Sequence, residues 1–97
     1  MNCSPDLILD YLNRARVRCT YQAFARVLGV PEQSSGQYLG DPRPEASWVV
    51  KKTGKHKGEP EGYADYNKHP ELHRTSYIIE TEDDLRRCMR RDVTEFP

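Results

Sequence analysis

Residues 20–40 read TYQAFARVLGVPEQSSGQYLG and carry the strongest structural pattern of the chain. Thr20 is a typical helix N-cap, because its hydroxyl can accept a hydrogen bond from a free N–H of the first turn. Gly29 suits the left-handed position that ends a helix, and Pro31 suits the first turn of the next helix. Between them, apolar residues recur at helical spacing at Ala23, Phe24, Val27 and Leu28.

A second short helix follows this turn. Tyr38 and Leu39 give it an apolar side, and Gly40 can end it. The stretch therefore predicts a helix-turn-helix over about residues 20–40, a unit whose second helix often enters a DNA groove. Gly36 lies inside that helix at a cost of roughly 1 kcal/mol relative to alanine, which indicates a close contact there with protein or with DNA.

The flanking segments predict an α+β domain. Before the helix-turn-helix, Ser4-Pro5-Asp6 is typical of a helix start, and residues 16–19 link this first helix to the next. After it, Asp41–Pro44 forms a turn that cannot continue a helix. Ser47–Lys52 is rich in β-branched and aromatic residues and predicts a strand.

A β-hairpin over about residues 47–58 is the next expectation. Thr53-Gly54 can make the reverse turn, and Lys55–Lys57 can begin the return strand. Together with three N-terminal helices and a C-terminal helix, this hairpin would be the wing of a small winged-helix-like domain. Its lysines could contact phosphates, or could form a solvated basic hairpin.

The remaining chain, residues 59–93, predicts an acidic loop and the C-terminal helix. Tyr63 and Tyr66 would order the loop, and residues 75–80 (TSYIIE) resemble a strand. Thr81, followed by three acids, is a strong helix start, because acids stabilise the positive end of the helix dipole.

Length and composition are typical of one small domain over residues 1–97. Of the residues, 36% are hydrophobic and 31% are charged, and the mean hydropathy is -0.89. No apolar run approaches the roughly 20 residues that span a bilayer. The N-terminal residues do not resemble a signal peptide, so we expect a cytoplasmic protein with no membrane partner.

Charge is unevenly distributed along a chain whose net charge is zero. Residues 14–57 hold nine basic and three acidic side chains, a net charge of +6, whereas residues 59–84 hold two basic and eight acidic ones, a net charge of −6. This asymmetry favours an anionic partner for the first segment. Alternatively, the two charged regions could simply aid solubility.

No catalytic or metal-binding pattern stands out. The three cysteines are scattered and predict reduced thiols rather than a disulfide framework. His69 and His73 are four residues apart, a spacing that suits a metal only if further ligands join them. Trp48 is expected to anchor the core, with base stacking as the alternative. We therefore expect no catalytic residue, metal or cofactor.

Several segments resemble O6-alkylguanine-DNA alkyltransferases and alkyltransferase-like proteins. Thr20-Tyr21 followed by Phe24–Gly29 resembles the family's TYGEIARALG stretch, and Gly36–Leu39 resembles the end of its recognition helix. Trp48–Lys55 is similar to its RVINSQGR strand and turn, and Pro60–Gly62 to the LPEG of some alkyltransferase-like proteins. The resemblance implies a winged-helix domain that enters the DNA minor groove and flips out a modified base.

Carried over residue by residue, the resemblance also implies a loss of chemistry. Tyr21 matches the tyrosine that acts near the flipped nucleotide's phosphate, whereas Gln33 stands at the position of the intercalating arginine. Ala46 replaces the reactive cysteine and Ser47 the histidine that activates it. Alanine offers no nucleophile, so alkyl transfer is not expected.

The sequence thus predicts a non-enzymatic DNA-binding protein that contacts mainly phosphates. The alternative is a protein–protein adaptor on the same fold, with the acidic residues 59–84 as a possible surface for a protein partner. The candidate DNA-binding residues are Tyr21, Arg26, Gln33, Ser34, Gln37, Lys51, Lys52, Lys55 and Lys57.

Overall fold

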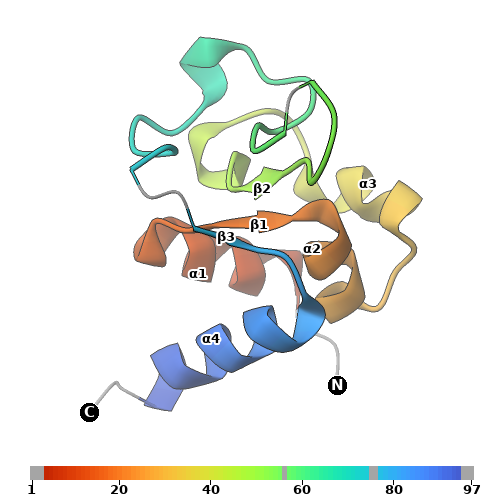
Figure 1. Cartoon of the computed structure of the whole chain (residues 1–97), viewed down its shortest axis with the longest axis vertical. Coiled ribbons are helices and arrows are strands. Elements are labelled where there is room, and N and C mark those ends of the chain that lie inside the picture. Colours follow the sequence, from red (N-terminus) through yellow and green to blue (C-terminus); the bar gives the residue numbers. More distant parts are fainter. Residues whose placement is uncertain (1–3, 56, 75–76, 95–97) are drawn as a thin grey trace.

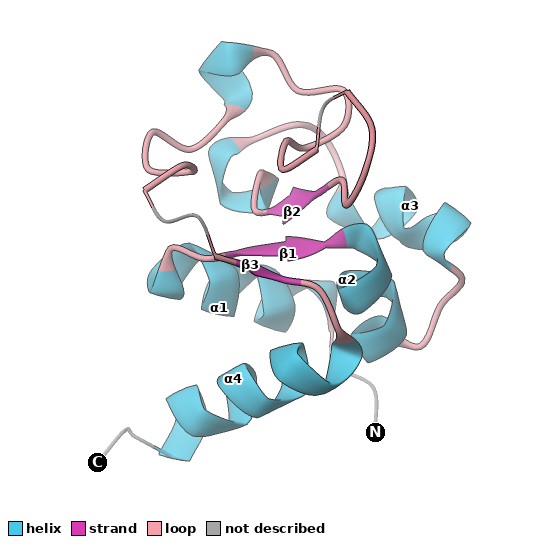
Figure 2. Cartoon of the chain, viewed as in Figure 1, coloured by secondary structure: helices cyan, strands magenta, loops and turns pink. Residues whose placement is uncertain are grey.

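A computed structural model of the protein describes residues 4–55, 57–74 and 77–94. Within these ranges the chain forms four α-helices and a three-stranded sheet (Figures 1 and 2). In chain order the elements are α1 (Pro5–Ala15), β1 (Arg18–Thr20), α2 (Tyr21–Leu28), α3 (Ser35–Leu39), β2 (Val49–Val50), β3 (Ile78–Ile79) and α4 (Glu82–Thr94). The described chain also contains the one-turn 3-10 helices η1 (Glu32–Ser34), η2 (Pro44–Ala46) and η3 (Asp65–Asn67). The expected α+β class is confirmed.

The sheet is parallel throughout, with strand order β2-β1-β3. In the central strand, Cys19 pairs with Val49 on one side and with Ile79 on the other. All three of these residues are fully buried. Burial on both faces explains why the strand at Val49–Val50 is a continuous apolar run without polar alternation.

The core lies where helices from both ends of the chain meet the sheet. Figure 1 shows α1, α2 and α4 gathered on one side of β1, with the segment between α3 and β3 folded over the other side. Trp48 and Phe24 are the largest fully buried side chains. The indole N–H of Trp48 donates to Asn13 Oδ1 at 3.0 Å. Trp48 is thus a core anchor with its polar atom paired.

The predicted helix caps at Ser4, Thr20 and Gly29 are confirmed, whereas Pro31, expected in the first turn of the second helix, precedes the 3-10 turn η1. The Ser4 hydroxyl accepts the Leu7 N–H at 3.2 Å at the start of α1. Thr20 Oγ1 accepts the Ala23 N–H at 3.2 Å at the start of α2. Gly29 ends α2 in the left-handed conformation with a φ of 81°, which glycine adopts without a Cβ penalty.

The expected hairpin at residues 47–58 differs from the observed arrangement. β2 pairs with β1 in parallel, and Lys55 and Lys57 lie in turns and form no return strand. Instead the Lys51 N–H donates to the Glu59 carbonyl at 3.1 Å, and the Gly58 N–H donates to the Lys51 carbonyl at 2.9 Å. These two hydrogen bonds close a loop at residues 51–58, the basic loop, which follows directly from the buried strand β2. Val49 and Val50 are both buried, so they need a partner within the core, and β1 provides it.

The loop that follows departs from expectation in one detail. Tyr63 is half-buried and packs against the core, whereas Tyr66 is 85% exposed in η3. Of the two tyrosines predicted to order this loop, only Tyr63 makes core contacts. None of the helices within the described ranges combines the length and hydrophobicity of a membrane span.

Candidate nucleic-acid interface

Helix α3 lies at the edge of the molecule, next to α2 and η1 (Figure 1). Its apolar contacts are made by Leu39, which is 5% exposed, and Ser35 is buried beside it. The Ser35 hydroxyl donates to the Glu32 carbonyl at 2.7 Å and fixes η1 on α3. Gln33 and Gln37 are exposed. Of the two apolar residues expected on this helix, Leu39 is buried but Tyr38 is 45% exposed. The outward face of η1 and α3 therefore carries Gln33, Gln37 and Tyr38.

Gly36 is on that outward face. A Cβ built at this position would meet nothing within 4 Å. The sequence indicated a close contact at Gly36 with protein or with DNA. The structure excludes a close contact with the described part of the chain, so this glycine leaves open space beside α3.

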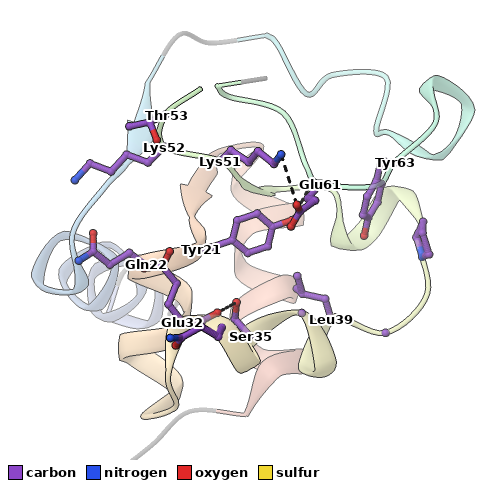
Figure 3. Close-up of a pocket in the computed structure, with 14 residues that line it drawn as sticks. Tyr21, Gln22, Glu32, Ser35, Leu39, Lys51, Lys52, Thr53, Glu61 and Tyr63 are labelled. Atoms are coloured by element: carbon purple, nitrogen blue, oxygen red, sulfur yellow. Dashed lines mark hydrogen bonds and ion pairs between the residues drawn. The ribbon is translucent and has the colours of Figure 1, made fainter. Parts of the chain in front are cut away.

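An open pocket of about 830 Å³ separates α3 from the basic loop. Figure 3 shows the side chains of Tyr21, Lys51 and Glu61 converging on it. The residues that line it are Tyr21, Gln22, Glu32, Gln33, Ser35, Gly36, Leu39, Gly40, Pro42, Lys51, Lys52, Thr53, Glu61 and Tyr63. The volume lies within the range of small-ligand sites, and the lining is mixed polar and apolar.

Tyr21 connects the walls of this pocket. As the first residue of α2 it follows directly from the buried strand β1, which fixes its position. Its hydroxyl accepts the Glu61 N–H at 2.9 Å. Burial raises the pKa of Tyr21, partly offset by that hydrogen bond. The phenol therefore stays protonated at neutral pH and keeps a donor hydrogen for a further acceptor.

The base of the basic loop is tied to the sheet. Arg18 of β1 is 7% exposed, and its Nη1 donates to the Gly58 carbonyl at 3.0 Å. Burial lowers the pKa of Arg18, and the nearby charge of Glu59 opposes that effect. Gly58 has a φ of +83°, and a Cβ there would lie 3.1 Å from Arg18 Nη1. This position therefore requires glycine.

Glu59 accepts hydrogen bonds from two residues further along the chain, Lys68 and His73. Lys68 Nζ lies 2.6 Å from Glu59 Oε1, and His73 Nε2 contacts Oε2. Burial by itself would raise the pKa of Glu59. The hydrogen bonds and charges of Lys68 and His73 outweigh burial, so the pKa lies below its ordinary value. This cluster holds the end of the basic loop in place.

The structure brings some of the predicted DNA-binding residues together. Tyr21, Gln33, Lys51 and Lys52 all line the pocket. Arg26 is exposed on α2, one turn beyond the pocket residue Gln22. The other predicted residues, Ser34, Gln37, Lys55 and Lys57, lie outside the pocket lining, on the adjoining α3 region and basic loop.

Sequence reasoning missed other residues of the pocket. Gln22, Glu32 and Glu61 come from three segments that meet only in the folded chain. Gln22 stands next to Tyr21 in the sequence, so the resemblance could have drawn attention to it. Glu61 belongs to the quoted Pro60–Gly62 segment, but no sequence signal indicates its contact with Lys51.

The acidic residues 59–84 are largely paired within the protein. Six of the eight acids in this stretch form ion pairs or hydrogen bonds with described basic side chains. They are Glu59, Glu61, Asp65, Glu71, Glu82 and Asp84. The negative segment therefore offsets local positive charge more than it presents a free acidic surface.

The two histidines singled out by spacing do not converge. The ring of His69 packs on Trp48 with centroids 4.8 Å apart, and its Nδ1 accepts the Glu71 N–H at 3.0 Å. His73 instead contacts Glu59. In the part of the chain that the structure describes, no three His, Cys, Asp or Glu side chains gather as metal ligands.

Comparison of the chain with protein-family models, with curated proteins and with solved structures finds no match. The function proposed for it therefore depends on the residues themselves.

Proposed function

We propose that the protein is a non-enzymatic DNA-binding protein with a winged-helix type of module, similar to a degenerate alkyltransferase-like protein. In this proposal α2 and α3 form the helix-turn-helix, and the basic loop at residues 51–58 takes the place of the wing. Binding is mainly to phosphates, through Arg26, Lys51, Lys52, Lys55 and Lys57.

The observation that carries the proposal is the position of α3 relative to the lysines. Gly36 of α3 and the preceding Gln33 of η1 are exposed and line the same pocket as Lys51 and Lys52. Lysines at the rim of a pocket next to an exposed helix suit a polyanion whose backbone crosses that rim, because ammonium groups contact phosphates without reading sequence. Gly36, with open space around it, allows a close approach.

Two features support a function without covalent chemistry. Ala46, at the position that the resemblance assigns to a reactive cysteine, is fully buried. Cys19 is also fully buried, and burial raises its pKa, so its sulfur stays a neutral thiol. A neutral thiol is a poor nucleophile.

Replacing one pocket lysine tests the proposal. Lys52 is exposed, lines the pocket and forms no ion pair with any described residue. Lys52→Ala should weaken binding of unrelated duplexes to the same degree and reduce the slope of log affinity against log salt by about 0.9, the contribution of one phosphate contact. Fluorescence anisotropy with labelled duplexes measures both quantities.

Arg90→Ala is the matched control, because it removes one exposed positive charge from α4, outside the proposed surface. It should leave the salt slope unchanged. Equal effects of the two variants would show that only net charge matters and would contradict the proposed surface. Absence of duplex binding at low salt would favour the adaptor alternative.

A further inference from the structure

We propose that Glu61 is an intramolecular competitor for the anion that Lys51 binds, so that segment 58–63 restrains the DNA surface. This inference rests on the proposed DNA-binding function and concerns the regulation of the same surface. An incoming phosphate gains Lys51 only by displacing the Glu61 carboxylate.

The competing contact is a direct one. Lys51 Nζ lies 3.6 Å from Glu61 Oε1, with the lysine side chain 33% exposed and the glutamate 70% exposed. Figure 3 shows the Lys51 side chain extending across the pocket wall toward Glu61. No described carboxylate pairs with the remaining lysines of the loop, Lys52, Lys55 and Lys57. The restraint therefore acts on one specific cation of the surface.

The backbone around Glu61 keeps its carboxylate near Lys51. The Glu61 N–H is bonded to the Tyr21 hydroxyl at 2.9 Å. The preceding residues Gly58 and Glu59 are hydrogen-bonded to the backbone of Lys51 itself. Pro60, between Glu59 and Glu61, is buried. Displacement of Glu61 by a phosphate therefore needs only rotation of an exposed side chain, and the segment can stay in place.

The size of the effect follows from the exposure of the pair. An exposed ion pair changes an equilibrium by up to about fivefold, because water and salt screen it. Neutralising Glu61 should therefore tighten DNA binding roughly two- to fivefold at low salt. It should also steepen the salt dependence by up to about 0.9 in slope, since Lys51 then pairs with phosphate without releasing a carboxylate.

The experiment compares Glu61→Gln with Glu32→Gln, each in the wild-type and in the Lys51→Ala background. Glu32 is the matched control, because it lines the same pocket and carries the same charge but pairs with no described cation. Affinity for a labelled duplex is measured for all variants over a range of salt. In the wild-type background, we expect Glu61→Gln to increase duplex affinity more than Glu32→Gln does. In the Lys51→Ala background, the two substitutions should change the affinity equally.

Two results overturn the inference and leave the proposed function standing. One is an increase in duplex affinity from Glu61→Gln that is no larger than the increase from Glu32→Gln. The other is a larger increase in affinity from Glu61→Gln than from Glu32→Gln that persists in the Lys51→Ala background. The failure of the proposed function is different in kind: then no variant, Glu61→Gln included, binds duplex in a salt-dependent way, and both statements fall together.

Discussion

Single residues in this protein show how burial and charge fix a loop that the proposed function uses. Glu59 lies at the end of the basic loop and accepts hydrogen bonds from Lys68 and His73. These partners hold its pKa below the ordinary value, against the opposing effect of burial. A carboxyl group whose pKa is lower in the folded state stabilises the fold when ionised, so its protonation links stability to pH.

The sign of that link gives a prediction. Stability from Glu59 is fully present above the unfolded pKa of about 4.3 and is lost as pH falls through the lower folded pKa. Glu59→Gln should therefore destabilise the protein near neutral pH. Below about pH 5 the variant should lose less stability with falling pH than the wild type does. Urea unfolding of both proteins at several pH values measures this. Parallel pH profiles for wild type and variant would contradict the role assigned to Glu59.

Among the elements, α3 is short and contains a glycine, which lowers its helix propensity. Gly36 sits inside a five-residue helix with open space where a Cβ would be. Glycine therefore weakens α3 without a packing reason in the described structure. We interpret this as room for a DNA backbone to approach.

Gly36→Ala should change the stability of the protein and its affinity for DNA in opposite directions. The variant should be more stable by about 0.5–1 kcal/mol, because alanine is the better helix former, yet bind duplex DNA more weakly. Gly58→Ala is the comparison: its φ of +83° and its contact with Arg18 predict a loss of stability. Thermal unfolding and anisotropy measure the two properties. Unchanged DNA affinity in Gly36→Ala would argue against contact at α3.

The elements also show what the sequence can predict. Caps and turn residues such as Ser4, Thr20 and Gly29 act locally, so the ends of α1 and α2 were predictable. The pairing of β2 with β1 was not, because Val49 and Cys19 are far apart in the sequence and meet only in the parallel sheet. The pocket was not predictable either: the sequence named Lys51 and Lys52 as DNA-binding candidates but gave no sign of the contact between Lys51 and Glu61.

Across the whole molecule, zero net charge conceals an internal division. The acids of residues 59–84 are mostly paired with nearby bases, while Lys52, Lys55 and Lys57 form no ion pair with any described residue. In the proposed function, long-range attraction to DNA is therefore weak, and we expect binding to depend on local contacts near α3. Such binding should be strongly salt-dependent, since each phosphate contact releases a counterion.

The affinity of the wild-type protein for duplex DNA, measured as a function of salt, decides whether the protein binds DNA as proposed. Five cations are assigned to phosphates, so the slope of log affinity against log salt should be negative and no steeper than about −4.5. A measurable affinity at low salt that falls along this line is the predicted result. No binding at low salt, or an affinity that does not depend on salt, would show that the protein is not the proposed phosphate-contacting DNA binder.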